Sequence, residues 1–109
     1  MHRTANSSAR ELVQHREEFR GSNLFGCWDK ELEQYAVYSY GSHWPLFIWE
    51  DGAWYENSGK YSLTTTRHHS QCHPCCETTL LTPAEMCRIN TVGARKYMLA
   101  RLKGEPAYA

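Results

Sequence analysis

The sequence of 109 residues contains no apolar run near the length of a membrane helix. Such a helix needs roughly 20 consecutive apolar residues. The N-terminus also lacks the apolar core of a signal peptide. The sequence therefore predicts a cytoplasmic protein that does not enter a membrane. In that compartment the five cysteines, an odd number, are expected to be reduced thiols rather than a disulfide framework.

A net charge is also missing, because twelve basic and twelve acidic residues balance. A neutral chain is not the expected general binder of a nucleic-acid backbone. The charges are nevertheless segregated along the sequence. Residues 28–57 hold six acids and one lysine. Residues 88–103 hold no acid and the bases Arg88, Arg95, Lys96, Arg101 and Lys103. This separation favours docking to a partner of mixed charge. The alternative is that the two charged segments form ordinary solvated faces of the domain.

No internal repeat or low-complexity tract divides the chain, so we expect one domain over residues 1–109. A Ser-x-x-Glu capping box at residues 8–11 predicts an N-terminal helix over about 8–20. A Thr-Pro-x-Glu start at residues 82–85 predicts one or two C-terminal helices over about 83–103. The second region is expected to break between Asn90 and Gly93, before a further helical stretch that starts at Ala94.

Residues 35–67 are rich in β-favouring side chains and predict an antiparallel sheet of three to four strands. The strongest turn signal is the Asp-Gly pair at residues 51–52. A two-residue turn there sets Glu50 opposite Ala53 and fixes the pairs outward as far as Phe47. One hairpin thus has a predicted register.

A second tight turn, at residues 58–59, would set Tyr55 opposite Ser62. Because side chains alternate along a strand, the face that carries Trp49 and Trp54 is expected to form the core. The opposite face, with Tyr55, is expected to be more polar. The order of elements predicts an α+β domain with its helices on one face of the sheet.

Only one Cys-x-x-Cys pair, Cys72 and Cys75, has the spacing of a zinc knuckle. A structural zinc site usually shows two ligand pairs. The candidates for the missing ligands are His68 or His69, together with Cys76, Cys87 or Cys27, and His69 and Cys87 are the ones we name for the site. We expect no cofactor, with zinc as the open alternative to a reduced, cysteine-containing loop.

A polar stretch before this pair brings many hydrogen-bond donors together at the end of a predicted strand. Arg67 and the neighbouring threonines suit phosphate oxygens. His43, Lys60 and His68 would supply an acid, a base and a cation for RNA cleavage without a metal. No recognised enzyme signature surrounds them, so an ordinary threonine-rich edge strand remains the alternative.

The stretch VYSYGSHWPLFIWEDGAWYENSGKYSLTTTRHHSQ, residues 37–71, resembles a group of small uncharacterised proteins of bacteriophages and mobile elements. The shared pattern is a YSYG strand, an HWP-like turn, a WYEN turn and a KYSxTTxRH strand. The resemblance covers about one third of the chain and implies no established activity. The CHPCC run lies outside the pattern.

Proteins of this origin often block a host machine, which by analogy suggests a small inhibitor or adaptor of the anti-CRISPR kind. The expected partner is a host protein or nucleoprotein complex, with nucleic acid reached through that partner. Surplus aromatic residues and segregated charges suit such an interface. Trp44 would either cover the core or contact the partner. The candidate binding residues are Tyr38, Tyr40, Trp44, Tyr61, Thr64, Thr65, Arg67, His68, Arg95, Lys96 and Arg101. The alternatives are the small RNase and a zinc-stabilised binding module.

Overall fold

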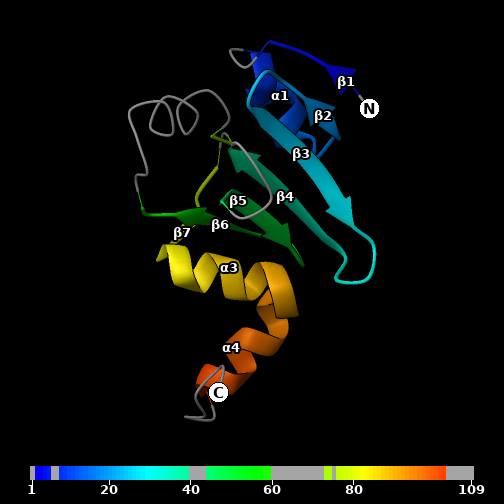
Figure 1. Cartoon of the computed structure of the whole chain (residues 1–109). Coiled ribbons are helices and arrows are strands. Elements are labelled where there is room, and N and C mark those ends of the chain that lie inside the picture. The colour runs from blue at the N-terminus through cyan, green and yellow to red at the C-terminus, as the bar shows by residue number, and fades with distance from the viewer. Residues whose placement is uncertain (1, 6–7, 40–43, 60–72, 75, 103–109) are drawn as a thin grey trace.

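The computed structural model describes residues 2–5, 8–39, 44–59, 73–74 and 76–102 (Figure 1). Its strands are β1 (His2–Arg3), β2 (Phe19–Arg20), β3 (Leu24–Asp29), β4 (Gln34–Ser39), β5 (Pro45–Glu50), β6 (Ala53–Asn57) and β7 (Thr79–Leu81). Its helices are α1 (Ala9–Gln14), α3 (Pro83–Val92) and α4 (Ala94–Leu102). The predicted α+β class is confirmed. In the described part of the chain, no helix is both long and apolar enough to span a membrane.

The sheet is larger than the predicted three to four strands and is not purely antiparallel. Seven strands lie side by side in the order of the sequence. The β1–β2 and β6–β7 pairs are parallel, and the four pairs between them are antiparallel. The added strands were missed because β1, β2 and β7 are too short to show alternation, and Gly26 interrupts β3.

The hairpin of β5 and β6 has the predicted register. Glu50 pairs with Ala53, and the ladder continues outward to Phe47 opposite Glu56. Both residues of the turn between the strands have positive φ, 53° at Asp51 and 82° at Gly52. An Asp-Gly pair tolerates this conformation, which matches the twist of the strands.

The second predicted turn is wrong in its pairing. On the other side of β6, Tyr55 pairs with Thr79, so β7 takes the place in the sheet that the prediction gave to the strand after residue 59. The part of the predicted sheet from residue 60 to 67 lies outside the described residues.

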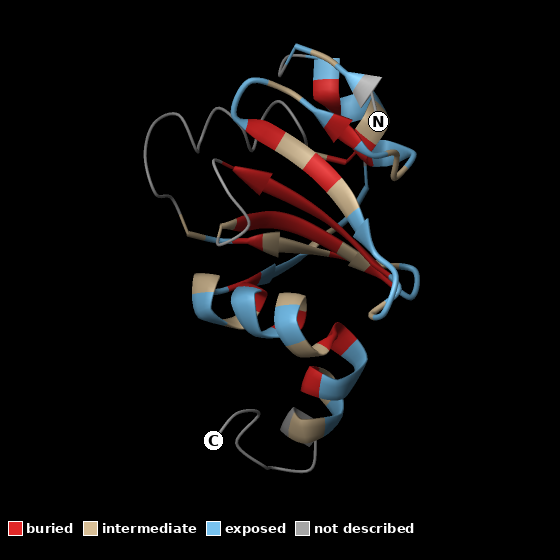
Figure 2. Ribbon diagram, turned by 45° about the vertical axis from the view of Figure 1, so that its right-hand side comes forward, coloured by how far each residue is buried: buried red, intermediate tan, exposed pale blue. Residues whose placement is uncertain are grey.

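Both faces of the sheet are covered, which corrects the expectation of helices on one face. On one face α1 packs with Phe47 and Trp54 in a core that also holds Phe19. On the other face α3 and α4 pack over Ile48 and the partly buried Tyr55. Figure 2 shows β4 and β5 buried along nearly their whole length. Side chains of alternate residues therefore enter two different cores.

The N-terminal helix is shorter than predicted. It spans Ala9–Gln14, the side chain of Ser8 makes no capping hydrogen bond, and Phe19 belongs to β2. Arg16 has a left-handed φ of 54°, which ends the helix. The carbonyl groups of Arg16 and Glu17 accept hydrogen bonds from the sheet, so contacts distant in sequence override the helical pattern.

The C-terminal helices agree with the prediction. Thr82 and Glu85 form a reciprocal capping box at the start of α3. Gly93, with a φ of 94°, separates α3 from α4. α4 then extends beyond the sheet toward the C-terminus (Figure 1).

Candidate functional site

Most of the candidate residues named from the sequence lie outside the described part of the chain. They are the catalytic candidates His43, Lys60, Arg67 and His68, the metal candidates His69, Cys72 and Cys75, the binding candidates Tyr40, Tyr61, Thr64 and Thr65, and the side chain of Arg101. The RNase and the cysteine-based zinc hypotheses therefore stay predictions.

Of the remaining candidates, two are packed in the interior. Tyr38 is buried, and burial raises the pKa of its hydroxyl, an effect that a hydrogen bond from Asn90 partly offsets. Trp44 is half-buried against the α1-side core, which matches the role of a core cap.

The others lie on helix surfaces. Cys87 is exposed on α3, and the described residues contain no group of three or more His, Cys, Asp and Glu side chains placed to hold a metal ion. Arg95 and Lys96 are exposed on α4. Among the described residues that were predicted to bind a partner, these two bases are therefore the exposed ones.

A buried carboxylate holds the start of α4 against the sheet. The side chain of Glu50, 8% exposed, accepts hydrogen bonds from the backbone N–H groups of Ala94 (2.8 Å) and Arg95 (3.1 Å). A negative charge at a helix N-terminus satisfies these N–H groups and complements the helix dipole. Because α4 follows Gly93 directly, it has no capping side chain of its own. The absence of a capping side chain before α4 is the feature of the sequence that could have indicated a cap supplied from a distant part of the chain.

A buried amide completes this attachment. Gln34 donates from Nε2 to Glu50 (2.9 Å) and to the carbonyl of Ile89 in α3 (2.8 Å). Asn90 donates to Gln34 Oε1 (3.0 Å) and to the hydroxyl of Tyr38 (2.8 Å). This network fixes both C-terminal helices to β4 and β5, so the position of α4 is determined by buried polar contacts.

A pocket of about 350 Å³ lies where α4 meets the turns of the sheet, and we call it the α4 pocket. Its apolar lining includes Leu32, Val92 and Leu99, and Leu99 is 49% exposed. Its charged lining is Glu31, Glu33, Glu50, Asp51, Arg95 and Lys96. The acids come from the sheet and the bases from α4. The segments of opposite charge thus meet at one pocket rather than forming two distant faces.

The charges around the α4 pocket are only partly paired. Asp51 and Arg95 form an ion pair at 3.0 Å in which both side chains are more than 70% exposed. Exposed pairs of this kind contribute little to stability. Within the described residues, Glu31, Glu33 and Lys96 take part in no ion pair. These three charges are therefore free to meet charges on another molecule.

A row of aromatic rings crosses the sheet on the α1 side. Trp28, Tyr35, Trp49 and Trp54 are consecutive partners in the β3–β6 ladders. Trp28 is 38% exposed, and its ring nitrogen donates to the carbonyl of Arg16 at 2.9 Å. The guanidinium of Arg16 lies 4.5 Å from the centre of the Trp49 ring. The row closes the core, as the sequence predicted for Trp49 and Trp54.

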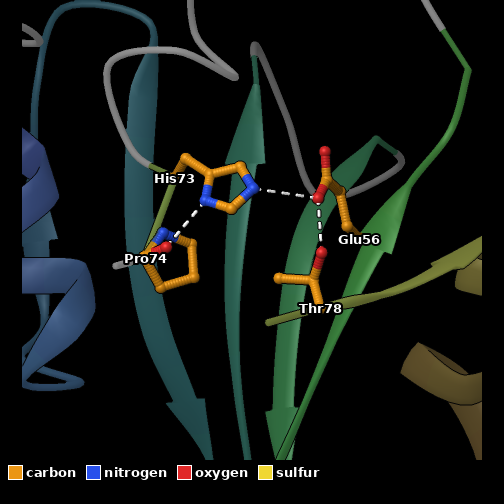
Figure 3. Close-up of polar contacts among 4 residues, drawn as sticks. All are labelled: Glu56, His73, Pro74 and Thr78. Carbon is orange, nitrogen blue, oxygen red and sulfur yellow. Dashed lines mark hydrogen bonds and ion pairs between the residues drawn. The ribbon is translucent and has the colours of Figure 1, made fainter. Parts of the chain in front are cut away.

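A histidine–carboxylate pair lies at the β7 side of the sheet (Figure 3). His73 Nε2 is 3.1 Å from Glu56 Oε1, and the Thr78 hydroxyl donates to the same oxygen at 2.6 Å. The sequence predicted no role for His73, which lies between Cys72 and Cys75. No local signal links Glu56 to it, because the two residues are 17 positions apart.

No protein-family model matches the sequence, and neither a curated protein nor a solved structure matches the chain.

Proposed function

We propose that the protein is a non-enzymatic inhibitor or adaptor that docks on a host protein or nucleoprotein complex through the α4 pocket. The observation that carries the proposal is the composition of that pocket. The lining combines an exposed leucine and other apolar side chains with acids from the sheet and bases from α4. Interfaces combine these features, since apolar contacts supply affinity and complementary charges select the partner.

The pocket also defines the chemistry of the partner segment. An apolar side chain of the partner fits against Leu32 and Leu99. A basic residue on one side of it would meet Glu31 and Glu33, and an acidic residue on the other side would meet Lys96. A segment with the reverse order of charges would place like charges together, which is unfavourable.

A rigid attachment of α4 supports this assignment. Because Glu50 and Gln34 fix the helix to the sheet, little ordering of α4 is needed when a partner binds. The role against a host defence complex rests on the resemblance of residues 37–71 to small bacteriophage proteins. It also agrees with a docking surface that offers both signs of charge.

The test is capture of partners from host lysate, analysed for protein and nucleic acid, followed by affinity measurements with variants. We expect Lys96→Glu and Leu99→Asp each to weaken binding to the captured partner by about tenfold or more. Arg88→Glu removes a base of the same sequence segment that does not line the pocket, and it serves as the matched control. Unchanged affinity in both pocket variants, with folding intact by circular dichroism, would refute the proposal.

A further inference from the structure

One edge of the described sheet is formed by β7 (Figure 1). In its parallel pairing with β6, Leu80 lies opposite Glu56 and Leu81 lies opposite Asn57. The N–H of Ser58 donates to the carbonyl of Leu81 at 2.8 Å, so the backbone groups of Leu81 face β6. Both backbone groups of a strand residue point to one side, and the side alternates along the strand, so those of Leu80 face away from β6. Among the described residues, neither group of Leu80 has a hydrogen-bond partner.

The side chain of Leu80 is also open to solvent. It is 63% exposed, the highest value for a large apolar residue in the described part of the chain. It points to the opposite face from Leu81, which is buried in the core on the α3 side. Residues 78–82, with the sequence Thr-Thr-Leu-Leu-Thr, carry no charge. A strand edge with open backbone groups, an exposed leucine and no charge is a template for pairing with another strand.

The opposite edge of the sheet, formed by β1, is protected by a charge. The N–H of Thr4 donates to the carbonyl of Arg20 at 3.1 Å, so Arg3 is the residue of β1 whose backbone groups face outward. Arg3 is exposed, and a charged side chain at an edge discourages pairing. Pairing of β7 with β1 of another copy would form an open row of molecules. Because only the β7 edge is uncharged, the sheet favours a closed pair.

We propose that β7 pairs antiparallel with β7 of a second copy, about a two-fold axis at Leu80. Each Leu80 N–H donates to the carbonyl of the other Leu80, which is the exchange found in a hydrogen-bonded antiparallel pair. The two leucine side chains lie next to each other on one face and remove apolar surface from water. Thr79 lies opposite Leu81, and Thr78 lies opposite Thr82, so no like charges meet. A copy thus satisfies every open group of this edge, which has no charge to select a foreign partner.

The contact is short, so the dimer is weak and depends on protein concentration. Leu80 does not line the α4 pocket. The pairing is therefore independent of the proposed docking function.

The first experiment is sedimentation equilibrium of the full chain under reducing conditions. We expect the average mass to rise from monomer toward dimer between about 10 μM and 1 mM, the range of a weak contact. Leu80→Lys keeps the backbone groups but sets two positive charges against each other, and it should raise the Kd of the dimer by at least about tenfold. Leu99→Lys makes the same change at the exposed leucine of α4 and should leave the Kd unchanged. Circular dichroism checks that both variants keep the fold.

The second experiment tests the register by mild oxidation. In Leu80→Cys the two introduced thiols belong to a hydrogen-bonded pair whose Cα atoms lie about 5.5 Å apart, within the reach of a disulfide. In Thr79→Cys each introduced thiol lies opposite Leu81 of the copy, so much less of this cross-link should form. Peptide mapping by mass spectrometry separates these cross-links from any made by the five native cysteines.

Three results would overturn the proposal. One is a monomer throughout the concentration range. Another is a dimer that persists in Leu80→Lys and is lost in Leu99→Lys, which would assign the contact to the α4 pocket. The third is equal cross-linking by Leu80→Cys and Thr79→Cys, which would contradict a two-fold axis at Leu80.

Discussion

Glu50 is the side chain on which the position of α4 depends most directly. Its carboxylate accepts from the Gln34 amide and from the first two N–H groups of α4. In Glu50→Ala the N–H of Ala94 stays buried without this acceptor, whereas Gln34 keeps its bond to the Ile89 carbonyl. Arg95 is exposed, so its N–H can turn to water.

The expected loss of stability follows from these groups. A buried donor left without its partner costs about 1–3 kcal/mol. Loss of the negative charge at the helix N-terminus adds about 0.3–2 kcal/mol. Together the two contributions should lower the free energy of unfolding by about 1–5 kcal/mol. Each kcal/mol corresponds to a fall in Tm of roughly 4–8 °C in a domain near this size.

The assay is chemical and thermal unfolding followed by circular dichroism, with Asp51→Asn as the control, because Asn removes the charge and tolerates the positive φ at this position. Asp51 is the adjacent acid, but its ion pair with Arg95 is exposed, so its removal should change stability little. Glu50→Gln, which keeps the shape and loses the charge, should fall between the two. Equal unfolding midpoints for Glu50→Ala and Asp51→Asn would refute the view that the buried carboxylate holds α4.

Three further predictions concern other parts of the molecule. Gly26→Ala should destabilise the fold by about 1–3 kcal/mol, because the added Cβ would lie 2.4 Å from the Tyr35 hydroxyl and 2.7 Å from Phe19 Cε1. Gly52→Asn is the control in unfolding experiments, because open space surrounds Gly52 and Asn tolerates a positive φ. An unchanged unfolding midpoint for Gly26→Ala would contradict the close packing around Gly26. Burial, with the carboxylates of Glu18 and Asp29, raises the pKa of the Cys27 thiol. Iodoacetamide at pH 8 should therefore label Cys27 more slowly than the exposed Cys87, and equal rates by mass spectrometry would speak against this. Purified protein is expected not to turn over RNA, and turnover that disappears in His68→Ala would establish the RNase alternative instead.

The predictions that succeeded rest on interactions between neighbours in sequence. The Asp-Gly turn fixed the β5–β6 register because two residues with positive φ admit few other loops. The Thr82 cap and the break at Gly93 located both C-terminal helices for a similar reason. The prediction over residues 8–20 failed because the polypeptide after Gln14 is drawn to the sheet by Trp28 and Tyr35, which no local pattern reveals.

The candidate site shows the same division. The sequence named Arg95 and Lys96 as contact residues from their charge alone, and they are exposed on α4. It did not reveal that Glu31, Glu33 and Asp51 would face them across an apolar pocket. It also could not join His73 to Glu56, because that contact depends on where the chain returns to β6.

The sequence by itself thus determined the α+β class, the central hairpin, the C-terminal helices and the segregation of charge. These features follow from turn chemistry, capping and composition, which act within a few residues. The tertiary structure alone decided the seven-stranded order, the coverage of both faces, and the meeting of acidic turns with a basic helix. The physical reason is that short strands and buried carboxylates find their hydrogen-bonding partners in distant parts of the chain. Their positions therefore depend on the packing of the complete domain.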